Sequence, residues 1–132
     1  MKYNCKIKKQ GSLYIAEFPD MPNVQTCGKT KKEALEMAKD ALEGCLAVSL
    51  DENLEIPTPS YSQGEPVEVS AKVAFAIELR IARGTQSQSA VAKKAGMTYQ
   101  QYQRLENPKK TNPTLETLEK LQKVFQHPFL AL

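Results

Sequence analysis

The chain has 132 residues, of which 41% are hydrophobic and 25% are charged, and its formal net charge at pH 7 is +3. This length allows one domain or two small ones, with enough apolar residues to bury a core. The sequence shows neither a signal segment nor an apolar run long enough to cross a bilayer, so we expect a cytoplasmic protein with no membrane partner.

The charge is divided unevenly along the chain. Residues 1–66 carry 8 Lys plus Arg and 10 Asp plus Glu, whereas residues 67–132 carry 10 and 5. Such asymmetry is typical of a phosphate-binding module attached to a module with another task. A modest basic surplus is also compatible with an ordinary solvated surface, so it supports nucleic-acid binding without establishing it.

The first part of the chain predicts a small antiparallel sheet. Residues 3–8 alternate in type and residues 13–18 are apolar and aromatic, with Gln10-Gly11-Ser12 between them, which is the pattern of a β-hairpin. Residues 24–27, after two prolines, can form a third strand.

A long helix is expected to cover that sheet. Thr30 and Glu33 have the spacing of a capping box, and apolar residues then recur every three or four positions as far as Leu46. The predicted fold class of this module is therefore α+β, with three to four antiparallel strands and one covering helix.

The sequence predicts that residues 56–68 separate two modules. The stretch around them contains three prolines, a glycine and several polar residues, which excludes a helix. We expect a linker, with short extended pieces such as residues 67–69, between one module at residues 1–55 and an all-α module at residues 69–132.

The second module contains two short helices joined by a tight turn. Ser87 and Thr98 are good N-caps, and Gly96 falls where the first helix must end. Helices joined so closely cross steeply, either as a helix-turn-helix that reads the DNA major groove or as ordinary bundle packing. On the DNA-reading interpretation, Gln can pair with adenine and Arg with guanine. The expected base-contacting residues are Tyr99, Gln100, Gln103 and Arg104.

This half of the chain resembles the Xre/Cro/phage-repressor class of helix-turn-helix domains. The resemblance is carried by Gln88, Ala92, Gly96, Leu105, Glu106 and Asn107, followed by NPTLETLEKL at residues 112–121. The family usually has glycine where this chain has Pro108, so the resemblance says less about that loop. It implies contacts to the DNA backbone from Gln88, Thr98, Asn107, Lys109 and Lys110.

The first half resembles the HicB antitoxin family. The specific segments are FPDMP at residues 18–22 and GKTKKEALEMAKDAL at residues 28–42, and the similarity continues through IPTPS. The resemblance implies a truncated ribonuclease H fold that binds and blocks a HicA-like toxin, a messenger-RNA-cleaving ribonuclease. It also implies that the C-terminal module represses the operon by binding double-stranded operator DNA.

No catalytic constellation is visible in the sequence. A ribonuclease H site needs several convergent carboxylates to hold Mg²⁺, and the first strand has none, while Asp20 is most simply a turn residue between two prolines. We therefore expect no enzyme, no cofactor and no metal. The three cysteines, Cys5, Cys27 and Cys45, are expected to be reduced and buried, and the alternative is a zinc site that they form with His127.

Carboxylates are the groups expected to face the toxin, because an RNA-binding nuclease is basic and opposite charge aids association. The alternative, for the helical positions, is a solvated helix face. The candidate toxin-binding residues are Glu17, Asp20, Glu36, Asp40 and Glu43.

Repressors of this class bind paired half-sites, so we expect a homodimer or a homotetramer. The apolar end of the chain would contribute to its interface, or else fold back on its own domain. The candidate dimerisation residues are Leu118, Leu121, Phe125, Phe129 and Leu130. The alternative function is an Xre-family repressor whose N-terminal module senses a small ligand.

Overall fold

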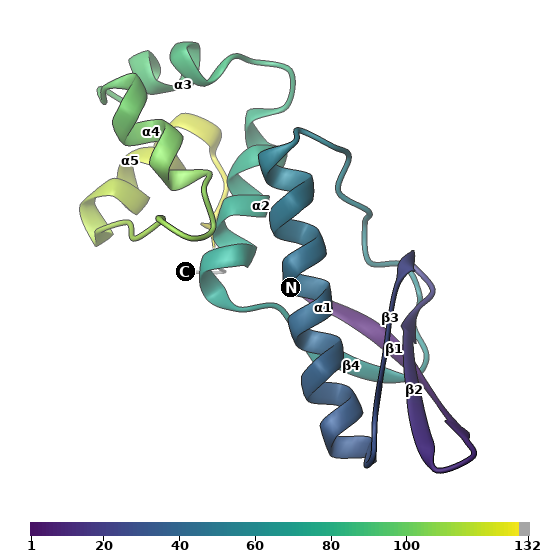
Figure 1. Ribbon diagram of the computed structural model, residues 1–132. Coiled ribbons are helices and arrows are strands. Elements are labelled where there is room, and N and C mark those ends of the chain that lie inside the picture. The colour runs from purple at the N-terminus through teal and green to yellow at the C-terminus, as the bar shows by residue number, and fades with distance from the viewer. Residues whose placement is uncertain (130–132) are drawn as a thin grey trace. The chain divides into compact units, whose positions relative to one another are not determined.

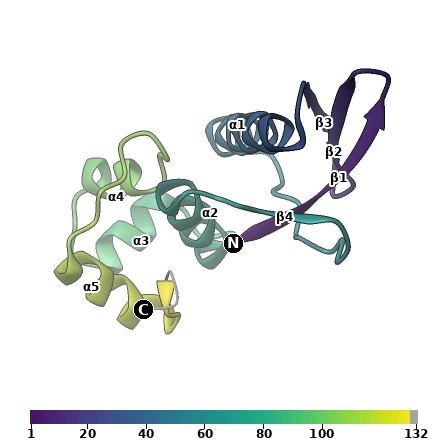
Figure 2. The same ribbon diagram turned by 90° about the horizontal axis from the view of Figure 1, so that it is seen from below.

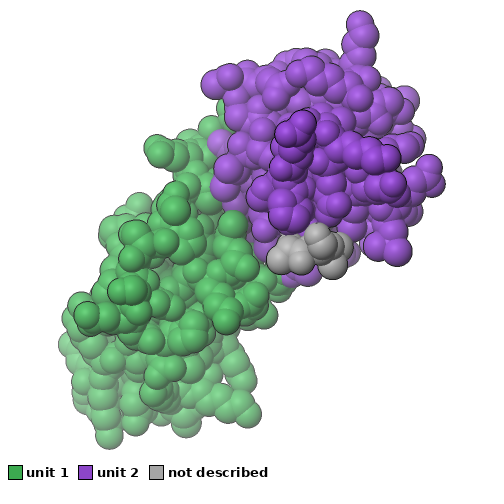
Figure 3. Space-filling view, turned by 180° about the vertical axis from the view of Figure 1, so that it is seen from behind, with its two compact units in different colours: residues 1–70 green, residues 71–132 purple. Residues whose placement is uncertain are grey.

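A computed structural model describes residues 1–129, which fall into two compact units divided between Ser70 and Ala71 (Figure 3). The first unit carries 8 Lys plus Arg against 11 Asp plus Glu, a net charge of −3. The second unit carries 10 against 4, a net charge of +6. The division into an acidic and a basic part is therefore sharper than the sequence halves suggest.

The first unit is a four-stranded sheet with one helix on it (Figures 1 and 2). Its strands are β1 (Lys2–Gln10), β2 (Leu13–Phe18), β3 (Met21–Gly28) and β4 (Glu65–Glu68). They lie in the order β3-β2-β1-β4, and each neighbouring pair is antiparallel. The helix is α1 (Lys31–Asp51). The predicted α+β fold class is confirmed.

Helix α1 begins at Thr30, whose hydroxyl accepts a hydrogen bond from the Glu33 backbone N–H (3.0 Å). Its buried side chains recur four residues apart, so they form one stripe toward the sheet. These core residues are Ala34, Ala38, Leu42 and Leu46. The opposing sheet contributes the buried side chains of Tyr3, Cys5, Ala16 and Phe18.

The segment expected to be a linker, residues 56–68, belongs to the first unit instead. Its end forms β4, in which Val67 lies opposite Tyr3 of β1, and the Tyr3 hydroxyl donates to the carbonyl of Pro57 (2.6 Å). Gly64 has a φ of 83° and faces the backbone of Cys5 so closely that any side chain would collide with it. Proline and glycine indicated a non-helical segment, but both also occur at sheet edges.

The second unit packs four helices around one apolar core. They are α2 (Ala71–Arg83), α3 (Gln88–Lys94), α4 (Tyr99–Leu105) and α5 (Leu115–Phe125). Gly96, with a φ of 69°, lies in the turn between α3 and α4, in the left-handed conformation that glycine adopts without steric cost. The core includes Phe75, Leu79, Val91, Tyr102 and Leu121.

Within the described residues, the apolar segment at 125–129 folds back on this core. Leu118, Leu121 and Phe129 are buried within it, and Phe125 packs against it. The ring of Phe129 meets that of Phe75 edge-on, with centroids 5.8 Å apart. The structure thus places these four expected dimerisation residues inside their own unit, the second of the two alternatives, while Leu130 lies outside the described residues.

Candidate nucleic-acid and protein interfaces

Helix α4 presents a polar face to solvent. The Thr98 hydroxyl accepts from the Gln101 backbone N–H (3.1 Å), and the Gln101 side chain accepts from the Thr98 backbone N–H (3.0 Å). This reciprocal capping box fixes the first turn of α4. The expected base-contacting residues share one face of the helix and are all exposed: Tyr99, Gln100, Gln103 and Arg104. The inward side of α4 is held by the buried side chains of Tyr102 and Leu105.

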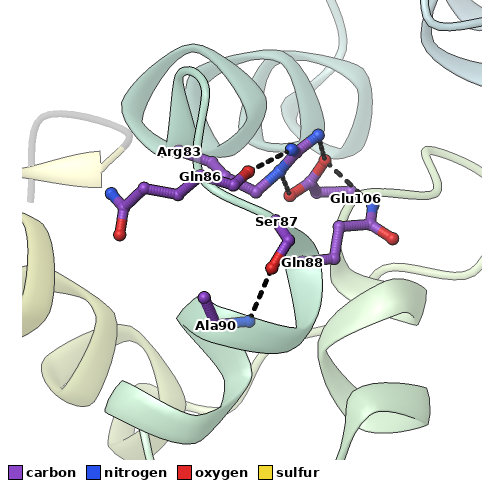
Figure 4. Close-up of polar contacts among 6 residues, drawn as sticks. All are labelled: Arg83, Gln86, Ser87, Gln88, Ala90 and Glu106. Carbon is purple, nitrogen blue, oxygen red and sulfur yellow. Dashed lines mark hydrogen bonds and ion pairs between the residues drawn. The ribbon is translucent and has the colours of Figure 1, made fainter.

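A largely buried ion pair holds the far end of α4 (Figure 4). The Arg83 guanidinium donates from Nε to one Glu106 oxygen (2.7 Å) and from Nη2 to the other (3.0 Å). The Arg83 Nη1 also donates to the carbonyl of Gln86 (2.8 Å), and the Gln88 Nε2 donates to Glu106 (3.2 Å). Because Glu106 caps α4, this cluster ties α4 to α2 and to the start of α3.

The Arg83 and Glu106 charges stabilise each other where little water reaches them. The Arg83 and Glu106 side chains are only 14% and 6% exposed. The hydrogen bonds with Glu106 raise the pKa of Arg83, and burial, followed by the nearby Glu106 carboxylate, raises the pKa of Tyr102. The arginine therefore stays charged and the tyrosine stays neutral at any physiological pH.

Sequence reasoning missed this pair. The two residues are 23 positions apart, and no helical or strand period connects them. Glu106 was recognised only as one of the residues that match the Xre/Cro/phage-repressor class, without a structural role. The signal that could have found it was a carboxylate directly after α4, in a basic half of the chain, together with an arginine at the end of α2.

The residues expected to hold the DNA backbone surround α4. The Ser87 hydroxyl caps α3 by accepting a hydrogen bond from the Ala90 backbone N–H (3.0 Å; Figure 4). Gln88 is half-buried in the first turn of α3. Its side-chain amide has two N–H groups, one of which donates to Glu106. In the loop after α4, the Asn107 side chain accepts from the Lys109 backbone N–H (3.0 Å). Asn107 therefore shapes the loop, and Lys109 and Lys110 extend from it as exposed cations.

In the first unit, three of the five expected toxin-binding carboxylates already have partners inside the unit. Glu17 lies 3.2 Å from the Lys8 ammonium, and Glu43 accepts from the Ser70 backbone N–H (2.6 Å). Glu36 and Asp40 are exposed on α1, where no ion pair or hydrogen bond of their carboxylates is found within residues 1–129.

Among the five candidate toxin-binding carboxylates, Asp20 accepts the most hydrogen bonds. Its carboxylate accepts from the Ser60 hydroxyl (2.6 Å), from the Ser60 backbone N–H (3.0 Å) and from the Tyr61 backbone N–H (3.1 Å). These hydrogen bonds, the Ser60 hydroxyl first, lower the pKa of Asp20 below its ordinary value. The turn role expected for Asp20 thus extends to a segment 40 residues away along the chain.

The three cysteines of the alternative zinc site differ in how far they are exposed to solvent. Cys5 is buried, Cys45 is half-buried and Cys27 is exposed, so the expectation of three buried cysteines was wrong for Cys27. Within residues 1–129, no group of three or more His, Cys, Asp or Glu side chains could hold a metal ion. In that same range, no helix is long and apolar enough to cross a membrane.

A shallow groove of about 590 Å³ lies between α1 and β4. Its floor is apolar, formed by Leu35, Pro66 and Val67. Its rim carries Lys31, Lys32 and Lys39 together with Glu36 and Glu68. The volume is within the range of small-molecule sites. Lys31 is already paired with Glu65 (2.8 Å), so Lys32 and Lys39 are the rim cations that favour an anionic occupant.

The chain matches two protein families. Residues 2–80 match the HicB-like antitoxins of bacterial toxin–antitoxin systems, and residues 77–129 match a helix-turn-helix family. Antitoxin HicB 2 of Photorhabdus laumondii is 34% identical over 107 residues, which cover 80% of this chain and 77% of that protein. Antitoxin HicB of Escherichia coli K12 is 33% identical over 98 residues, covering 71% of each chain.

Among solved structures, the N-terminal domain of Burkholderia pseudomallei antitoxin HicB is similar, with a TM-score of 0.44 and 22% identity over 47% of this chain and 74% of that chain. The first family match spans more than half of this chain, and the family consists of antitoxins, not enzymes. The chain therefore belongs to the HicB-like family of bacterial antitoxins and carries a helix-turn-helix domain in its second half.

Proposed function

We propose that this antitoxin has two cytoplasmic activities, one in each unit. The first unit binds a HicA-type messenger-RNA-cleaving toxin and covers its active face, without chemistry on the RNA. The second unit represses the operon by binding operator DNA through α4. The observation that supports this most is the pairing of an acidic unit with a basic unit whose recognition helix is fixed at both ends.

The DNA-binding part works by two kinds of contact. Lys109, Lys110 and the side-chain amide of Gln88 suit phosphates, which position the protein without reading sequence. Gln100 and Arg104 suit adenine and guanine edges in the major groove. Two half-sites require two copies of the chain, so we propose a homodimer or a homotetramer, with an interface outside the core residues Leu118 and Leu121.

The DNA-binding proposal is tested by comparing base-reading with phosphate-binding residues. Gln100→Ala or Arg104→Ala should lower the affinity for the operator by about 1–3 kcal/mol and relax the preference at one base pair. Lys109→Ala or Lys110→Ala should weaken binding to operator and random DNA alike and flatten the salt dependence. Fluorescence anisotropy at several salt concentrations measures both. Equal losses on both DNAs for Gln100 and Arg104 would remove them from the base-reading set.

The toxin-binding proposal is tested by co-expression with the untagged product of the neighbouring gene. We expect the two proteins to purify together and the antitoxin to stop RNA cleavage in vitro. A soluble neighbour that cleaves RNA at the same rate with and without the antitoxin would contradict the proposal.

The lysine-rimmed groove supports a second candidate, a repressor whose first unit senses a small anionic ligand. Under this alternative, anionic metabolites should raise the melting temperature of the wild type, and Lys39→Ala should abolish the rise. A neighbouring gene for a short basic protein favours the antitoxin, whereas a metabolic gene favours the sensor.

A further inference from the structure

Helix α1 carries a second apolar face besides the one that covers the sheet. Met37, Ala41, Gly44 and Val48 are spaced by four, three and four residues, which places them in one stripe along the helix. We call these four residues the α1 ridge. Met37 and Val48 are 45% and 53% exposed, Gly44 is exposed and Ala41 is half-buried. None of the four belongs to the buried stripe that faces the sheet.

Within residues 1–129, nothing packed around Gly44 requires a glycine. It lies in the interior of the 21-residue helix, where glycine is less favourable than alanine, and a Cβ added to it would meet no atom within 4 Å. By contrast, a Cβ on Gly28 or Gly64 would collide with backbone atoms. A glycine that weakens its helix and relieves no internal contact is suited to the close approach of another molecule.

One side of the α1 ridge is bordered by carboxylates. Glu33, Asp40 and Asp51 are exposed and are separated by 7 and 11 residues, about two and three helical turns, so they form one row. Asp40 is three residues after Met37 and four before Gly44, which places this row next to the ridge. The three lysines of the groove lie on the opposite side of the helix.

We propose that the α1 ridge, with the carboxylates of Glu33, Asp40 and Asp51 beside it, is the surface on which the toxin docks, with Gly44 at the point of closest approach. This inference rests on the proposed toxin inhibition. A protein that binds and cuts RNA needs a cationic surface around its RNA site, and an apolar centre with an acidic border is complementary to such a surface. A second copy of this chain suits the ridge less well, because it would bring two acidic rows together.

The test changes the ridge without weakening the helix. Gly44→Ala should raise the melting temperature of the free antitoxin, because alanine is the better helix former, and should still weaken binding of the purified toxin. Gly44→Leu should weaken it further, by at least about 30-fold, the effect of a residue central to an interface. Gln10→Leu, which places a leucine at an exposed, uncharged position of β1 outside the ridge, should leave the affinity within about twofold. Isothermal titration calorimetry on the full chain measures all four proteins.

The outcomes separate this inference from the proposed function. A wild type that does not bind the toxin overturns the proposed function, and this inference with it. A wild type that binds, together with Gly44 variants of equal affinity, overturns the ridge alone. A Gly44→Leu protein that sediments as a smaller species yet binds toxin normally identifies the ridge as a contact between copies, and also overturns the proposal.

Discussion

The two units are held together in different ways. The first unit joins distant segments by polar contacts, with the Tyr3 hydroxyl on Pro57 and the Asp20 carboxylate on Ser60 and Tyr61, across 54, 40 and 41 residues of sequence. The second unit relies on capped helices around an apolar core and on the buried ion pair of Arg83 with Glu106.

This difference shows where each unit is vulnerable. The first unit depends on the last part of its own sequence, because β4 completes the sheet beside β1. In the second unit, the buried pair of Arg83 with Glu106 fixes the end of α4. A change confined to one unit should therefore leave the other unit folded.

The largest effect should come from removing β4. A fragment ending at Ser70 should unfold cooperatively in urea, because it contains the whole first unit. A fragment ending at Glu55 should show no cooperative transition, because it exposes the edge of β1 and the buried side chains of Tyr3 and Cys5. Circular dichroism during urea titration compares them. Equal midpoints would show that residues 56–70 are a linker after all.

Breaking the buried ion pair should be next in size. Glu106→Ala leaves the Arg83 charge buried without its partner, which should destabilise the second unit by about 3–5 kcal/mol. The signals of the first unit in a two-dimensional NMR spectrum should persist. Glu116→Ala is the control, because its pair with Lys120 is exposed and should contribute less than about 1 kcal/mol. A loss for Glu106→Ala as small as that of the control would contradict the role of the buried pair.

Loosening the Asp20 contacts should have a moderate effect confined to the first unit. Asp20→Ala removes the acceptor for the Ser60 and Tyr61 donors, and we expect a loss of about 1–2 kcal/mol, since the contacts are partly screened by solvent. Urea unfolding of the fragment ending at Ser70 measures this. Glu36→Ala, which removes an exposed carboxylate on α1, should change the midpoint little.

The smallest effect is a pH dependence from the same carboxylate. The pKa of Asp20 is lower in the folded state than its ordinary value, so its contribution is complete above about pH 4, the pKa of an unfolded aspartate, and is lost as the pH falls through the folded pKa. The stability difference between the wild type and Asp20→Asn should therefore be constant near neutrality and should shrink below about pH 4. A difference that does not change with pH would mean that the ionised form is not the one that binds Ser60.

Local patterns in the sequence predicted most of the elements. Thr30, Ser87 and Thr98 each begin a helix, as their N-cap chemistry indicates, and the hairpin around Gly11 joins β1 to β2. These features depend on neighbouring residues, so composition and periodicity reveal them. The exposed face of α4 was predictable for the same reason.

Nonlocal contacts were not predictable. A four-residue strand that contains Pro66 looks like a linker until its partner β1, near the start of the chain, is known. The Arg83–Glu106 pair and the return of Phe129 to Phe75 likewise join segments that no period connects. Among the candidate site residues, Glu17 and Glu43 looked like free carboxylates, and Asp20 looked like a residue bonded only within its own turn, because their partners lie elsewhere in the sequence.

The position of β4 at the end of the first unit also sets an order of events during synthesis. The sheet stays open until its last strand pairs with its first, and closing such a long loop is slow compared with forming local helices. Yet that strand is translated well before Phe129, which the core of the second unit requires. On a translating ribosome, the unit proposed to neutralise the toxin is therefore complete while the DNA-binding unit is still being made. If the proposed functions are correct, each new chain can inhibit the toxin before it can repress the operon.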